Sequence, residues 1–149
     1  MITINELADY VISSANAVGD PVSHLKLQKI CYYAQAWHLA VYGEPLVDET
    51  FEAWVHGPVS PTLYARFRGY RWNSITEDIA APSIDEGAAS HINEVLEVYM
   101  GMSGWDLERL THAEAPWISA RGGLQPDEPS NARISNDLMR DFYRQAMQN

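Results

Sequence analysis

The stretch SHLKLQKICYYAQAWHLAVYG, residues 23–43, decides the fold. Ser23 is a good N-cap residue and Gly43 a good helix stop, so the two bound one long helix. One apolar stripe on this helix comprises Leu27, Ile30, Cys31, Ala34, Trp37, His38 and Val41. Much of the remaining surface is apolar as well, and a helix that is apolar nearly all round is buried. We therefore predict a buried central helix from about Ser23 to Tyr42, whose wetter early turns carry Lys26, Gln28, Lys29 and Gln35.

Further helices are predicted on both sides of the central one. Capping residues followed by apolar residues at helical spacing indicate helix starts at Thr3, Ser60, Ser83, Ser103 and Ser135. Thr3 with Glu6, and Ser83 with Glu86, have the spacing of a capping box. The segment THAEAPW, residues 111–117, is expected to form a turn or a single helical turn. Residues 71–82 and 122–132 lack periodicity and are expected to be loops, the second of them mobile.

The periodicity changes between the central helix and the next one. Apolar residues at 51, 53 and 55 alternate with Glu52 and Trp54, which is typical of a short strand. Leu46 and Val47 lie across a possible turn at residues 48–49, so we predict a small β-hairpin near residues 45–55. Gly57 and Pro58 should then link the strand to a helix. The fold class predicted for residues 1–149 is one all-α domain with this hairpin.

The charge balance limits the kinds of partner. The 149 residues include 20 acidic and 10 basic ones, a formal net charge of −10. This charge argues against binding to nucleic acid or to an anionic membrane surface, both of which require clustered Lys and Arg. An acidic surface suits solubility, or a basic protein partner. No apolar run approaches the ~20 residues that span a bilayer, and the N-terminus has no secretory signal pattern. Cys31 is the single cysteine, which favours a location in the reducing cytoplasm. We expect Cys31 to be a small buried hydrophobic residue and not a nucleophile.

Signals for chemistry are weak. The five histidines have no zinc-binding spacing, and no Gly-rich phosphate loop occurs, so no metal or cofactor is predicted. The best catalytic candidates are His56, His112 and Glu114, with Glu52 as a further one, because a histidine and a carboxylate can serve as base and acid. No nucleophile or oxyanion donor is evident beside them. We favour the interpretation that His112 and Glu114 bind backbone groups at helix ends.

Four ordered motifs carry a family resemblance. They are the KLQK helix, the YG-x-PL turn, the EAW-x-x-GPV segment and the L-x-x-x-THAE-x-PW segment. With these motifs, residues 25–121 resemble the Panacea antitoxin domain, a family that includes SocA-like proteolytic adaptors and phage-associated proteins. His56 stands where tyrosine or phenylalanine is frequent, and Ala115 where glycine is frequent. Both departures are mild.

The resemblance implies a mainly helical antitoxin that neutralises a toxin encoded by an adjacent gene, mostly by protein contact. In the SocA-like branch it implies an adaptor that also delivers the toxin to a protease. It implies no enzyme, so an enzyme using His112 and Glu114 is the third hypothesis. The residues that we consider for partner binding are Glu52, Trp54, His56, Gly57, Pro58, Tyr64, His112, Glu114 and Trp117.

Trp54 is the most informative of these candidates. If Phe51, Ala53 and Val55 face the core, strand geometry places Trp54 on the opposite side, with His56 beside it. Trp54 would then face outward or line a groove. The alternative is that the helix beginning near Ser60 folds back and covers it.

Overall fold

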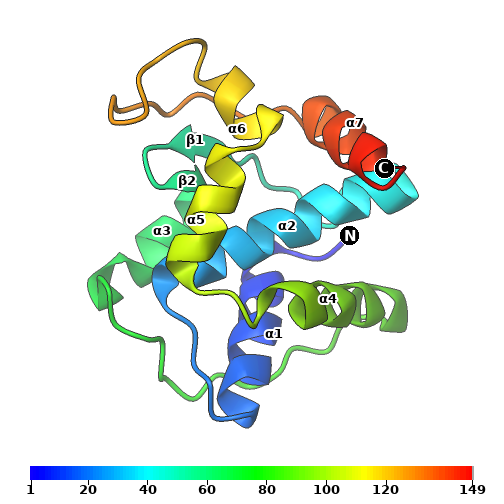
Figure 1. Ribbon diagram of the computed structural model, residues 1–149. Helices are drawn as coiled ribbons and strands as arrows, with labels where there is room; N and C mark the ends of the chain where they lie inside the picture. Colours follow the sequence, from blue (N-terminus) through cyan, green and yellow to red (C-terminus); the bar gives the residue numbers. More distant parts are fainter. Residues whose placement is uncertain (149) are drawn as a thin grey trace.

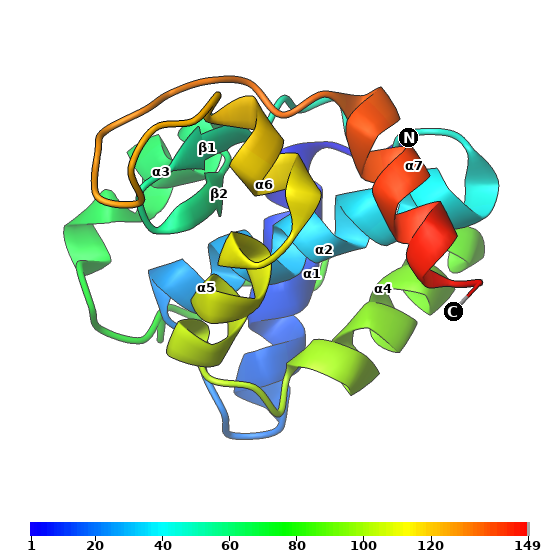
Figure 2. The same cartoon turned by 45° about the horizontal axis from the view of Figure 1, so that its top comes forward.

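Helix α2 crosses the middle of the molecule in the computed structural model, which describes residues 1–148 (Figure 1). It packs against α1, α4, α5, α7, α3 and β2, while Figure 2 shows α5 passing over it. The elements are α1 (Ile4–Ala17), α2 (His24–Tyr42), β1 (Glu52–Trp54), β2 (Gly57–Val59), α3 (Pro61–Phe67), the 3-10 turn η1 (Arg68–Tyr70), α4 (Glu86–Tyr99), α5 (Gly104–His112), α6 (Ala115–Ala120) and α7 (Asn136–Ala146). The predicted fold class, mainly helical with a small hairpin, is confirmed.

The middle of α2 is buried, as predicted for a central helix, and its last turn is not. Every side chain from Leu27 to Ala36 is buried. The last turn extends beyond the core: Val41, which was predicted to belong to the apolar stripe, is 51% exposed, and Tyr42 is 57% exposed. The helix begins after Ser23, whose Oγ accepts a hydrogen bond from the backbone N–H of Lys26 at 3.2 Å.

The prediction that Gln28, Lys29 and Gln35 lie on a wet face is wrong. All three are buried, because each bonds to backbone: Gln35 to the irregular segment that follows α2, and Gln28 and Lys29 to residues 58–60. Gln35 Oε1 accepts from the N–H of Leu46 and of Val47, and its Nε2 donates to Val47 O at 3.0 Å. These side chains give the segment the hydrogen bonds that a neighbouring strand would otherwise supply.

Gln28 and Lys29 supply such hydrogen bonds to the backbone of β2 and of the residue that follows it. Gln28 Oε1 accepts from Ser60 N at 2.8 Å, and its Nε2 donates to Ser60 O at 3.2 Å. Lys29 Nζ donates to Pro58 O at 3.1 Å. The KLQK motif therefore fixes the hairpin and the start of α3 on the central helix.

The hairpin lies at residues 52–59 and not at 45–55. β1 pairs antiparallel with β2, with Ala53 opposite Pro58 and a turn at Val55 and His56. Residues 57–58 thus form a strand and do not simply turn the chain into a helix. Pro58 is tolerated because β2 is an edge strand, where its missing N–H is not needed. The opposite edge of β1 meets the chain after α6: Ala53 N donates to Ala132 O at 2.8 Å.

Most predicted helix starts are correct. The caps at Thr3, Ser60 and Ser103 each accept a backbone hydrogen bond, and so does Ser135. The capping box at Ser83 is not formed, because α4 begins two residues later, with Asp85 at the N-cap. One stripe of α4 faces the core and includes Ala88, Ile92, Val95 and Tyr99.

Candidate partner-binding groove

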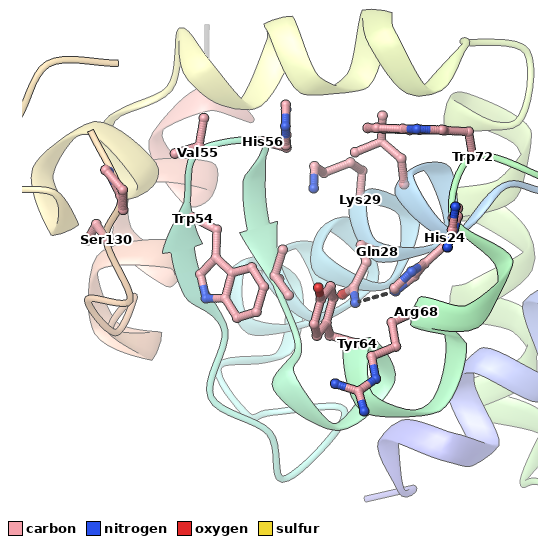
Figure 3. A pocket seen from close by; sticks show the side chains of 14 residues that line it. His24, Gln28, Lys29, Trp54, Val55, His56, Tyr64, Arg68, Trp72 and Ser130 are labelled. Atoms are coloured by element: carbon pink, nitrogen blue, oxygen red, sulfur yellow. Dashed lines mark hydrogen bonds between the residues drawn. The ribbon is translucent and has the colours of Figure 1, made fainter. Parts of the chain in front are cut away.

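A cavity of about 470 Å³ opens beside the hairpin (Figure 3). Its walls come from the first turns of α2, from the hairpin, from α3 and η1, and from the chain just after η1. The lining side chains are His24, Leu25, Gln28, Lys29, Trp54, Val55, His56, Val59, Tyr64, Arg68, Arg71, Trp72, Pro129 and Ser130. The size is typical of a pocket that takes one small ligand or a few side chains of a partner.

Trp54 forms one wall of the groove. Its indole Nε1 donates to Glu52 Oε1 at 2.8 Å, so Glu52 fixes the orientation of the ring. Tyr64 of α3 packs edge-on against it, with 4.9 Å between ring centroids, and is itself 41% exposed. Both alternatives for Trp54 are thus partly realised: α3 covers one side of the ring, and the ring lines the groove. Val55, which we expected in the core, lines the groove as well.

His56 and Trp72 form the opposite rim. Their rings are nearly perpendicular, with 6.3 Å between centroids, and Trp72 is 74% exposed. His56 Nδ1 lies 3.0 Å from Oε1 of Glu108, a carboxylate of α5 whose side chain is only 10% exposed. Trp72 is one of the five tryptophans that the sequence offers as possible interface anchors, but it was not among the residues selected for partner binding. A tryptophan in a polar loop was the available signal.

Lys29 forms the floor of the groove, and Gly57, which is not among the lining residues, packs closely behind it. Gly57 has φ +106°, and a Cβ added there would lie 2.6 Å from Lys29 Cε. Burial lowers the pKa of Lys29 to about 7, while the nearby Glu108 carboxylate opposes that shift. At the side of the floor, burial lowers the pKa of His24 to about 4, so this imidazole is neutral at pH 7. Its Nε2 lies 3.0 Å from Gln28 Nε2, the contact drawn in Figure 3.

His112 and Trp117 lie outside the groove, behind β1. The His112 ring stacks on the Trp117 ring with 4.0 Å between centroids, and burial lowers the pKa of His112. Trp117 Nε1 donates to Trp54 O at 2.7 Å. A backbone hydrogen bond with Val55 opposes the lowering of the His112 pKa, in line with the predicted backbone contact, while among residues 1–148 His112 Nε2 is buried without a partner.

The Glu114 carboxylate links three helices, and within residues 1–148 no hydrogen bond joins it to backbone. Its Oε1 accepts from the hydroxyl of Tyr33 in α2 at 2.7 Å and from that of Tyr143 in α7 at 2.8 Å. Burial raises the pKa of Glu114, and the two hydroxyls oppose that shift. In the described part of the chain, no hydrogen bond joins Glu114 to His112. The pair therefore has the contacts of structural residues and lacks those of an acid–base couple.

A metal site and a membrane-spanning helix are both absent from the described residues. No group of three or more His, Cys, Asp or Glu side chains is placed to hold a metal ion. Within residues 1–148, no helix combines the length and the apolar character that crossing a membrane requires.

The fold and the groove define a helical domain with an aromatic surface cavity, and comparisons with known proteins give its family. The family model described as antitoxin SocA-like, Panacea domain, matches residues 27–118. The chain is also 31% identical to Antitoxin SocA of Caulobacter vibrioides (strain NA1000 / CB15N) over 151 residues, which cover 93% of this chain and 80% of that protein. No solved structure matches the chain. The chain belongs to the SocA-like antitoxin family.

Proposed function

We propose that this protein is an antitoxin that neutralises a protein toxin by direct binding, and that the groove beside the hairpin is its contact surface. Membership in the antitoxin family supports the general role. The observation that carries the choice of surface is the rim of the groove, where Trp72 is 74% exposed next to a cavity with aromatic walls. Exposed aromatic side chains around a cavity are the usual anchors of protein interfaces.

The candidate residues take different parts in this proposal. Trp54, His56 and Tyr64 line the groove and would contact the toxin, together with Trp72. Glu52 orients the ring of Trp54 through the hydrogen bond at 2.8 Å. The remaining candidates would act on the shape of the surface and not on the toxin itself. Gly57 and Pro58 pack against Lys29 beneath the lining, and His112, Glu114 and Trp117 fix the hairpin and α7 on the core.

A binding role fits the chemistry of the groove better than catalysis. The candidate acid–base groups His112 and Glu114 are bonded or stacked within the core, away from the cavity lining. The net charge of −10 opposes nucleic acid and anionic lipid as partners. In this proposal the protein binds a protein partner, uses no cofactor and catalyses no reaction. It acts in the cytoplasm, where toxin and antitoxin are made. We further propose that residues 1–149 act as one unit, because α1 and α7, outside the family match, both pack on α2.

The experiment is co-expression with the open reading frame adjacent to this gene, scored for growth rescue, co-purification and toxin abundance. Direct neutralisation predicts rescue, a purified complex and an unchanged toxin level. A toxin level that falls only when a cellular protease is present would favour the adaptor hypothesis instead. Toxicity that the protein does not relieve, with no complex formed, would contradict the proposed function.

A further inference from the structure

The charge of the groove is opposite to that of the molecule. The chain carries 20 acidic residues and a net charge of −10, yet none of the 14 residues that line the cavity is Asp or Glu. The lining instead includes Lys29, Arg68 and Arg71. Two carboxylates that contact lining residues are already engaged: Glu108 pairs with His56, and Glu52 accepts from Trp54. An anionic ligand would thus be repelled by most of the surface and attracted here.

The two arginines are available to a ligand. Both are exposed, and neither guanidinium takes part in a hydrogen bond or an ion pair within residues 1–148. By contrast, the neighbouring Arg66 is already paired with Asp9 at 2.6 Å. Arg68 lies one helical turn beyond Tyr64, so both side chains reach the same edge of the cavity, as Figure 3 shows. A guanidinium without a partner binds a carboxylate well, since its fork matches the two oxygens.

The backbone that carries Arg71 and Trp72 is strained. Arg71 has φ +54°, the single positive value outside glycine in the described chain. Such a conformation costs about 1–3 kcal/mol for a non-glycine residue and recurs at ligand-binding positions. The guanidinium of Arg71 and the exposed indole of Trp72 come from adjacent residues on the rim. The strain is consistent with a rim shaped for binding.

The interior of the cavity is apolar. Leu25, Val55 and Val59 line it together with the rings of Trp54 and Tyr64. Lys29 also lines the cavity, but the residue is fully buried and its Nζ is bonded to Pro58 O. His24 is neutral at pH 7 because burial lowers its pKa to about 4. The positive charge that a ligand would meet is therefore concentrated on the rim, with an apolar interior behind it.

From this arrangement we infer that the groove binds an acidic segment of the toxin, an apolar side chain flanked by carboxylates. The apolar side chain would enter between Trp54, Tyr64 and Trp72, and the carboxylates would pair with Arg68 and Arg71. The inference rests on the proposed function for the source of the segment, but the chemistry of the groove can be tested without the toxin. The charge complementarity selects an acidic segment, although the overall charge of the antitoxin favours a basic partner.

The test uses two synthetic peptides that differ only in charge, acetyl-Asp-Asp-Leu-Phe-Asp-Asp-amide and acetyl-Asn-Asn-Leu-Phe-Asn-Asn-amide. Binding is measured by calorimetry and by tryptophan fluorescence. The groove variant is the double substitution R68Q/R71Q. Its control is R109Q/R140Q, which removes an exposed arginine of α5 and a half-buried arginine of α7, both ion-paired and both outside the groove. Both doubles change the net charge equally, so a difference between them cannot come from long-range electrostatics.

We expect the acidic peptide to bind wild type and the control double alike. We expect it to bind the groove double at least about tenfold more weakly, because a hydrogen bond to a charged group contributes about that factor. The amide peptide should bind wild type more weakly than the acidic peptide does, by a similar factor. Equal binding of the two peptides, equal binding to the two doubles, or no binding of the acidic peptide would overturn the inference. Displacement of the peptide by ADP at equal concentration would point to a nucleotide site and overturn it as well.

The two proposals can fail separately. Growth rescue without binding of the acidic peptide would refute the acidic segment and leave the antitoxin function standing. Arginine-dependent binding of the peptide without growth rescue would refute the antitoxin function and leave the chemistry of the groove standing.

Discussion

Replacing Gly57 by alanine tests whether the floor of the groove is as tightly packed as the structure indicates. The new Cβ would lie 2.6 Å from Lys29 Cε and 2.9 Å from Thr111 Oγ1, both well inside contact distance. Neither neighbour can move freely, since Lys29 is fully buried and bonded to Pro58 O, and Thr111 Oγ1 donates to Glu108 O. The backbone adds strain, because φ is +106°.

The expected loss of stability has two parts. A positive φ costs about 1–3 kcal/mol for a residue with a Cβ, and overpacking a core costs about 1–3 kcal/mol. Alanine regains up to ~1 kcal/mol by reducing the entropy of the unfolded chain. Gly57→Ala should therefore lower the free energy of unfolding by about 1–5 kcal/mol, equivalent to a fall in Tm of roughly 3–15 °C for a chain of this length.

Two other glycines separate these contributions in urea denaturation followed by circular dichroism. Gly19 has φ +72° and no atom within 4 Å of an added Cβ, so Gly19→Ala should show the strain alone, about 1–2 kcal/mol. Gly69 has neither strain nor a close neighbour, so Gly69→Ala should stay within about 0.5 kcal/mol of wild type. A Gly57→Ala protein as stable as the Gly69→Ala protein would refute the packing described for the floor.

Two further predictions concern buried polar groups. Burial lowers the pKa of Lys29 to about 7. Between pH 7.5 and 9.5 the unfolded chain therefore holds a proton that the folded chain has released. The free energy of unfolding should rise with pH over this range, by up to roughly 3 kcal/mol. Urea denaturation of wild type and Lys29→Met at these pH values should show that rise in wild type relative to the variant; equal slopes would contradict the assignment. Glu114→Ala leaves the buried hydroxyls of Tyr33 and Tyr143 without their acceptor and should cost about 2–4 kcal/mol, whereas Glu114→Gln keeps an acceptor and should lie within about 1 kcal/mol of wild type. Thermal unfolding measures both variants, and an equal loss in the two would show that the acceptor does not matter.

Much of the fold could be predicted from local signals. The bounds of α2 follow from Ser23 and Gly43, and four of the five predicted caps form, since a cap depends on residues only three positions apart. The hairpin was misplaced because strand pairing depends on partners that are distant in sequence. β1 bonds to residue 132 on one edge and to β2 on the other, and periodicity reports neither partner.

The buried polar side chains were the main error. Gln28, Lys29 and Gln35 read as solvent-facing because their burial is favourable only with backbone partners from residues 46–60, and those contacts are tertiary. For the same reason the candidate site divided into two groups. Trp54 and Tyr64 come together in the groove, while Glu114 is bonded in the core, and spacing along the chain could not separate the two groups.

The most direct test of the central claim compares two exposed tryptophans. Trp72 is 74% exposed on the rim of the groove, and Trp105 is 62% exposed on α5 and does not line it. The measurement is the Kd of Trp72→Ala and of Trp105→Ala for the toxin encoded by the adjacent gene, with Tm measured in parallel. We predict that both variants keep the Tm of wild type, that Trp72→Ala weakens binding by about 2 kcal/mol or more, roughly thirtyfold, and that Trp105→Ala binds as wild type does. Unchanged binding by Trp72→Ala, or an equal loss in both variants, would contradict the claim that the groove is the surface that holds the toxin.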